Sequence, residues 1–156
     1  MGFLYNRNII RENLLLIKKN PDNINCIYTE YDNLDYLYSY LCAMCKNGEK
    51  IQLTVGTKGY IDNRNNVDEF AKDMGVGADF MSHFTKLHPG FCLNKRNYRN
   101  VSYLSEDNGR TYEIRIYFND GRSQCVRTVM KCDLKKTLKD IEKTIREGRE
   151  SEPGSD

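Results

Sequence analysis

Apolar residues recur at helical spacing in five segments of the chain. Ile9, Ile10, Leu14 and Ile17 form the first stripe, which Pro21 ends. The same spacing predicts helices over residues 34–47, 67–74 and 78–88. The last predicted helix is capped by Asp133, ends at Gly148 and carries an apolar stripe. Its members are Leu134, Leu138, Ile141 and Ile145.

Other segments alternate apolar and polar residues, which is typical of half-buried strands. INCIYTEY and residues 50–55 predict short strands in the first half. After the basic segment FCLNKRNYRN, which we expect to be an irregular connection, come VSYLSED, RTYEIRIYF and SQCVRTVMK. The dipeptides NG and DG between these runs favour tight hairpin turns, so the runs predict an antiparallel meander. The sequence therefore predicts an α+β fold with this meander and a C-terminal amphipathic helix.

The stretch VDEFAKDMGVGADFMSHFTK, residues 67–86, has two short amphipathic parts joined by GVG. It resembles the helix-turn-helix family of DNA-binding domains. A small residue lies where the helices cross, a glycine lies at the turn, and apolar anchors lie on both sides. The matching residues are Phe70, Ala71, Met74, Gly75, Val76, Met81 and Phe84.

The order of the predicted elements over 34–118 is similar to that of a winged helix. This resemblance implies that the helix 78–88 enters the major groove of DNA. Base edges would be read near Ser82 and His83, and cations would hold the phosphates. The implied nucleic-acid-binding residues are Ala78, Ser82, His83, Lys86, Lys95, Arg96, Arg99 and Arg110.

The charge distribution supports the same surface. The net charge of +2 is too small to indicate a partner by itself. Between Phe80 and Ser105, however, there is no Asp or Glu, and the window holds four cations and both histidines. Double-stranded DNA is therefore the favoured partner, with a homodimer as a possible form.

Three alternative interpretations remain open. The stretch 67–86 equally fits a helical hairpin packed inside an α+β core. Cys42 and Cys45 form a C-x-x-C pair, and His83 and His88, or Cys92, could complete the four ligands of a zinc site. Because one pair does not define a tetrahedral site, we expect no metal and no cofactor. The third alternative is a phage-encoded, anti-CRISPR-like inhibitor that binds a host nucleic-acid-binding protein or defence nuclease.

The length of 156 residues and the 39% hydrophobic content fit one domain over 1–148, made of 34–118 and a strand-plus-helix addition over 119–148. A disordered tail is expected over 149–156. With no secretion signal or membrane-spanning run in the sequence, we expect a cytoplasmic protein with six reduced thiols and no membrane partner. The many Asn, Tyr, Lys and Ile residues suggest a phage or mobile element. No catalytic motif is present, so the chain is expected to be a DNA-binding regulator or replication accessory protein rather than an enzyme.

Overall fold

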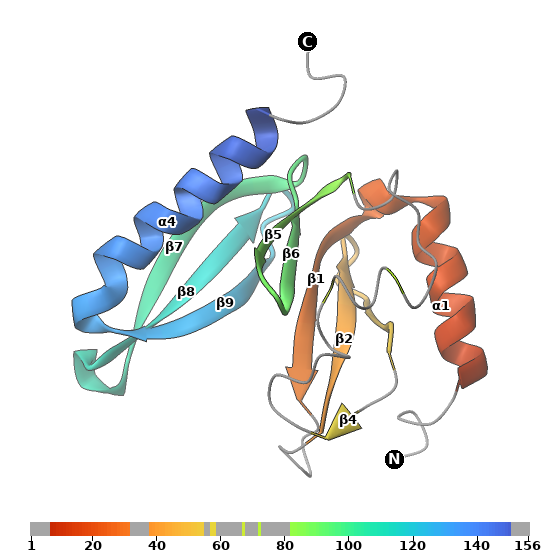
Figure 1. Cartoon of the computed structure of the whole chain (residues 1–156), viewed down its shortest axis with the longest axis horizontal. Helices are drawn as coiled ribbons and strands as arrows, with labels where there is room; N and C mark the ends of the chain where they lie inside the picture. Colours follow the sequence, from red (N-terminus) through yellow and green to blue (C-terminus); the bar gives the residue numbers. More distant parts are fainter. Residues whose placement is uncertain are drawn as a thin grey trace. The chain divides into compact units, whose positions relative to one another are not determined.

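The structure is a computed structural model that describes residues 7–31, 38–54, 57–58, 67, 72 and 82–150. The chain forms two compact units, Met1–Asn94 and Lys95–Asp156 (Figure 1). The described elements are α+β, with antiparallel sheets and a C-terminal helix. The segment 34–118, predicted to be winged-helix-like, therefore spans the boundary between the units.

The N-terminal unit is built on one antiparallel sheet in the order β3-β2-β1-β6-β5, with β4 paired to β2. Helix α1 covers one face of this sheet, and the short 3-10 turn η2 leads into β1. The bounds are α1 Arg7–Lys19, η2 Pro21–Asn23, β1 Ile24–Tyr31, β2 Tyr38–Cys45, β3 Lys50–Gln52, β4 Thr57–Lys58, β5 Phe84–His88 and β6 Phe91–Asn94.

The central strand of this sheet is β1, whose first five residues are all buried. Ile27 pairs with Ala43 of β2 on one side and with Cys92 of β6 on the other. Ile17 of α1 packs over these residues in the main core cluster. A strand that is covered on both faces loses the alternation of apolar and polar residues, because every position is then buried.

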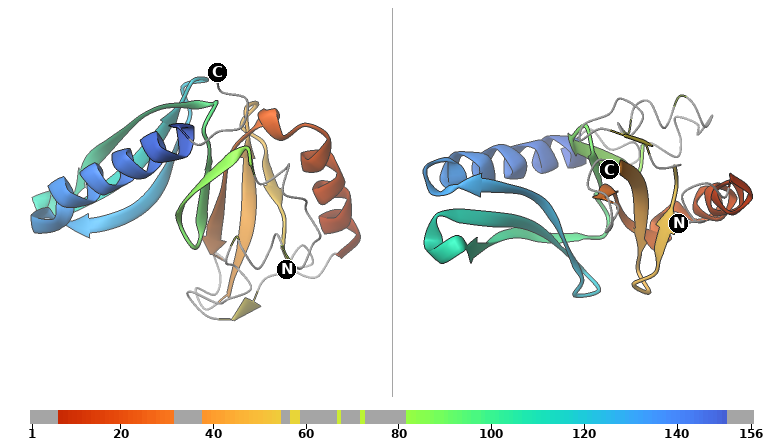
Figure 2. Two further views of the ribbon diagram at one scale, coloured as in Figure 1. Left: turned by 45° about the horizontal axis from the view of Figure 1, so that its top comes forward. Right: turned by 90° about the horizontal axis from the view of Figure 1, so that it is seen from below.

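The C-terminal unit is a three-stranded antiparallel meander in the order β7-β8-β9 with helix α4 lying across one face (Figures 1 and 2). The bounds are β7 Tyr98–Glu106, the 3-10 turn η4 Asp107–Gly109, β8 Thr111–Phe118, β9 Ser123–Met130 and α4 Lys131–Glu150. Asn108 and Gly109 in the first turn and Gly121 in the second have positive φ, as tight hairpin turns require. The predicted meander is thus confirmed.

The two faces of this sheet differ in chemistry. On the helix side, Ile114, Ile116 and Phe118 of β8 are fully buried, and Ile141 and Ile145 of α4 are buried as well. The register places the alternate residues on the opposite face, which is called the open face below. In rows across β7, β8 and β9 these are Glu106, Thr111 and Met130; Leu104, Glu113 and Thr128; Ser102, Arg115 and Cys125; and Asn100, Tyr117 and Ser123.

The predicted helix 34–47 is wrong, because residues 38–45 form strand β2. Leu41 and Met44 have helical spacing, but β2 is buried on both faces, so its sequence shows no alternation that would mark a strand. The strand β6 lies inside FCLNKRNYRN, which was predicted to be irregular, for the same reason: its four residues are all buried.

The predicted helix 78–88 is also wrong over its described part. Ser82 and His83 lie in a turn, and Phe84–His88 form β5, which pairs with β6. Pairing with β6 supplies backbone hydrogen bonds and burial that a local helical preference cannot match. The helix-turn-helix interpretation therefore has no recognition helix over 82–88. Val67 and Lys72 are helical, while the predicted turn at Gly75 lies outside the described residues.

The terminal helices agree with the sequence pattern. Helix α1 ends before Pro21 as predicted. Helix α4 begins two residues before the predicted cap Asp133, which lies in its first turn, and continues two residues beyond Gly148. None of the helices in the described segments is both long enough and apolar enough to cross a membrane.

Candidate nucleic-acid interface

Helix α4 gathers most of its cations on one part of its exposed surface. Successive residues of an α-helix rotate by about 100°, so positions three and four apart share a face. With the apolar stripe against the sheet, one side of the outer surface carries five cations, called the cation row below. They are Lys135, Lys136, Lys139, Lys143 and Arg146. Carboxylates border the row on both flanks: Asp133, Asp140 and Glu147 on one, where Glu147 lies one turn from Lys143, and Glu142 on the other.

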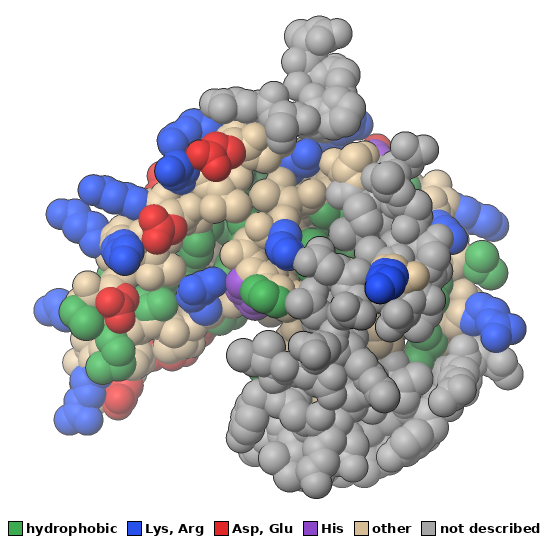
Figure 3. Space-filling view, in the orientation of Figure 1, with side chains coloured by type: hydrophobic (Ala, Val, Ile, Leu, Met, Phe, Trp, Pro, Cys, Tyr) green, Lys and Arg blue, Asp and Glu red, His purple; other side chains and the backbone are tan. Residues whose placement is uncertain are grey.

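All five side chains of the cation row are exposed. Figure 3 shows Lys and Arg side chains projecting from the region of α4, with fewer carboxylates among them. Lys143 Nζ lies 3.9 Å from Glu147 Oε1, which is an exposed pair with little binding energy of its own. The row belongs to a cationic part of the chain, since residues 95–150 hold 14 Lys and Arg against nine Asp and Glu.

Two of the cations predicted from the sequence lie at the ends of α4. The backbone carbonyl of Arg110 accepts a hydrogen bond from the N–H of Lys131 at 3.2 Å, at the start of the helix. Lys95 Nζ donates to the carbonyl oxygen of Gly148 at 3.2 Å, in the last turn. The side chain of Arg110 is exposed, and its backbone lies next to the first residue of α4.

Lys95 itself corrects the sequence prediction. It was expected to contact phosphate, but it is only 5% exposed. Its ammonium group is used inside the C-terminal unit. Arg96 and Arg99 nearby are exposed, as expected of phosphate contacts.

The remaining predicted residues belong to the N-terminal unit or lie outside the described residues. Ser82 and Lys86 are exposed, and His83 Nδ1 lies 3.5 Å from Asp22 Oδ1 in η2. Ala78 is not described. Ser82, His83 and Lys86 thus belong to a different unit from Arg96, Arg99 and Arg110, and the described segments contain no recognition helix over 82–88.

The sequence prediction missed the cation row. The signal was available in the segment KKTLKDIEKTIR, where cations recur three and four residues apart beside the apolar stripe. The apolar stripe marks the buried face of the helix, and the opposite face carries most of the cations. A cationic face of this kind is recognisable from sequence once the helix is accepted.

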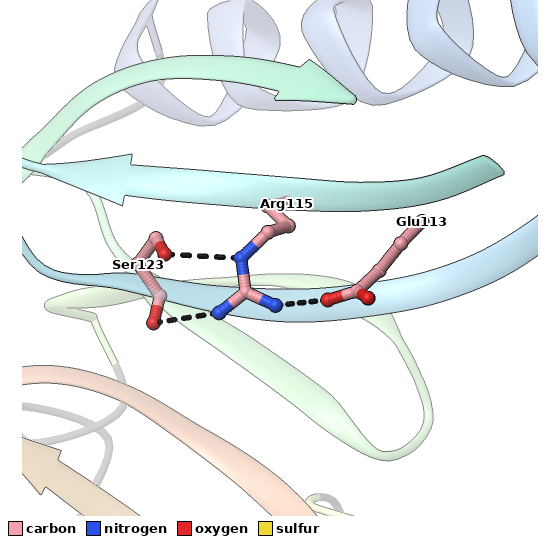
Figure 4. Close-up of polar contacts among 3 residues, drawn as sticks. All are labelled: Glu113, Arg115 and Ser123. Carbon is pink, nitrogen blue, oxygen red and sulfur yellow. Dashed lines mark hydrogen bonds and ion pairs between the residues drawn. The ribbon is translucent and has the colours of Figure 1, made fainter. Parts of the chain in front are cut away.

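The open face of the sheet carries a polar cluster centred on Arg115 (Figure 4). Arg115 Nε donates to Ser123 Oγ at 3.0 Å, and Nη2 donates to the carbonyl oxygen of Ser123 at 3.3 Å. Its Nη1 forms an ion pair with Glu113. Three of the five N–H donors of the guanidinium are thus engaged, and the side chain is held along the sheet rather than presented to a phosphate.

The pKa values of the titratable groups in this cluster depend on one another. Burial opposes ionisation of Glu113, but hydrogen bonds with Glu106 and Arg115 outweigh it and lower the pKa of Glu113. The hydrogen bond to Glu113 in turn raises the pKa of Glu106. Burial, followed by the negative charge of Glu113, raises the pKa of Cys125 to about 11. A thiol with this pKa stays protonated at neutral pH, which argues against a nucleophilic role.

We expect iodoacetamide at pH 8 to alkylate Cys132 first, because it is the exposed cysteine, and Cys125 much more slowly. At that pH, a thiol of pKa about 11 is roughly 0.1% thiolate. Replacing Glu113 with Gln removes a negative neighbour, so the pKa of Cys125 falls and its alkylation at pH 8 becomes faster. Peptide mass spectrometry over time measures both rates. Equal Cys125 rates in the wild type and Glu113→Gln would contradict this electrostatic coupling.

The C-x-x-C pair does not form a metal site in this arrangement. Cys42 and Cys45 lie three residues apart on β2, and side chains at odd spacing on a strand point to opposite faces. Cys45 accordingly lies in the core cluster under α1, while Cys42 pairs with Tyr28. Within the described segments, no three His, Cys, Asp or Glu side chains are grouped so as to hold a metal ion. All six cysteines are free thiols.

Comparisons of this chain with protein-family models, with curated proteins and with solved structures find no significant match.

Proposed function

We propose that the chain binds double-stranded nucleic acid, DNA foremost, through the cation row of α4. The observation that carries the proposal is the clustering of five exposed Lys and Arg side chains on one side of a single helix. From Lys135 to Arg146 the row extends about 16 Å along the helix axis at 1.5 Å per residue. A duplex presents one phosphate charge per about 1.7 Å of its own axis, so each cation has phosphates within reach.

The chemistry of the row favours phosphate contacts over base reading. Four of its five members are lysines, which act as flexible point charges rather than as bidentate base readers. Phosphate contacts position a protein on a duplex without carrying sequence information. The proposed role is therefore that of a replication accessory or other duplex-coating protein rather than a sequence-specific regulator.

The test is a fluorescence-anisotropy titration of the full chain with a labelled duplex of arbitrary sequence at several salt concentrations. If all five cations contact phosphates, the logarithmic salt slope is about −4.5, and affinity falls about 500-fold between 50 and 200 mM salt. Two unrelated duplex sequences should bind equally. No binding at 50 mM salt would reject the proposal. A strong preference for one sequence would reject the proposed sequence-independent role.

A second candidate function, binding of a protein partner, is supported by the open face. Leu104 and Met130 on this face are about half exposed, Arg115 lies one row from Leu104, and Tyr117 lies one row further along the same face. Arginine and tyrosine are enriched in protein-binding hot spots. An inhibitor of a host nucleic-acid-binding protein would use such a surface. Replacing Leu104 and Met130 with Ser would abolish capture of that partner and leave duplex affinity unchanged.

A further inference from the structure

Lys95 has a chemical environment that its predicted role does not explain. Its side chain is almost completely buried, and its Nζ donates to the Gly148 carbonyl at 3.2 Å. Gly148 belongs to the last turn of α4. Carbonyls in the last turn of a helix are often satisfied by side-chain donors. A positive charge at this end is also stabilised by the negative end of the helix dipole. The ammonium group is therefore a cap for the C-terminus of α4.

The segment that carries Lys95 is itself held in place. Asn119, in the turn between β8 and β9, donates its backbone N–H to the Asn97 carbonyl at 2.8 Å. The Nδ2 of Asn119 donates to the Arg96 carbonyl at 3.2 Å. Lys95 thus connects the turn before β7, which Asn119 holds, to the last turn of the helix.

This connection lies next to the end of the cation row. Ile145 is the last buried apolar residue of α4, so the residues after it depend on other contacts to stay helical. Arg146 directly follows Ile145, and Gly148 comes two residues later. On the basis of the proposed function, we infer that Lys95 is a positioning residue, which acts on nucleic-acid binding by holding the last turn of α4 and therefore Arg146. It does not itself contact phosphate.

The test compares Lys95→Met, Lys95→Arg and Arg146→Gln in the full chain by hydrogen exchange and by duplex binding. Methionine keeps the length of the side chain without the charge, and removing a buried charge need not weaken the fold. In Lys95→Met, the amide protons of residues 146–150 should exchange about tenfold faster, while those of residues 138–142 should be unchanged. Lys95→Arg, which can still donate to Gly148, should restore slow exchange.

Duplex binding separates positioning from direct contact. Arg146→Gln should make the salt slope less steep by about one, as expected for a lost phosphate contact. Lys95→Met should weaken binding about two- to fivefold with little change of slope, because a frayed turn lowers the fraction of molecules that present Arg146 in place. A slope change in Lys95→Met equal to that in Arg146→Gln would instead make Lys95 a phosphate contact and overturn the inference.

The proposed function and this inference fail in different ways. If the wild type binds no duplex, the proposed function fails, and exchange at residues 146–150 still decides whether Lys95 holds the last turn. If the wild type binds but Lys95→Met leaves both exchange and affinity unchanged, the positioning role alone is wrong.

Discussion

Replacing Lys136, Lys139 and Lys143 together with Gln is expected to lower the affinity for duplex DNA by about 100-fold or more at 50 mM salt. Each lost phosphate contact removes released counterions, so the logarithmic salt slope should become less steep by about 3. Glutamine keeps side-chain length and helix propensity, so α4 should remain folded. The measurement is the same anisotropy titration, with circular dichroism to verify helix content.

The matched control removes the same charge from the other terminal helix. Arg11, Lys18 and Lys19 are exposed cations of α1, and their replacement with Gln lowers the net charge equally. This variant should bind duplex with nearly the wild-type salt slope. If both triple variants lose affinity to the same extent, binding depends on net charge and not on the cation row.

The largest effect on stability is expected for Phe118→Ala in β8. Phe118 is fully buried on the helix side of the sheet, beside Ile116 and Ile114. Truncating a buried Phe removes its transfer free energy and leaves a cavity, which costs about 3–5 kcal/mol. That is a large part of the 5–15 kcal/mol typical of a folded domain. Urea unfolding followed by circular dichroism should show a markedly lower midpoint.

A surface position on the same sheet provides the comparison. Leu104 of β7 is about half exposed on the open face, so Leu104→Ala should change the free energy of unfolding by less than about 1 kcal/mol. If Phe118→Ala were as mild as Leu104→Ala, the packing of α4 against this face of the sheet would be wrong. Any loss of duplex binding in Phe118→Ala should follow the loss of helix content, since Phe118 is not part of the cation row.

Only part of the candidate site could be predicted from the sequence. Arg96 and Arg99 were predicted from the acid-free window and Arg110 from the winged-helix resemblance, and all three are exposed in the C-terminal unit. Lys95 was grouped with them because it belongs to the same basic segment, and only its contact with Gly148, 53 residues later, shows that it is buried. The cation row was visible in the helical pattern of the last segment but required the apolar face to be assigned first.

The sequence by itself determined the elements whose pattern is local. Helix α1, helix α4 and the meander β7-β8-β9 each have one buried and one exposed side, so their periodicity is visible, and the Asn-Gly and Asp-Gly turns separate the strands. Only the tertiary structure decided β2, β5 and β6. Cys42, Phe84 and Phe91 are buried residues of these strands. Strand β6 pairs with β1 from far away in the chain, and β5 pairs with β6 in a hairpin. Burial of both faces of β2 and β6 removes the alternation that identifies a strand.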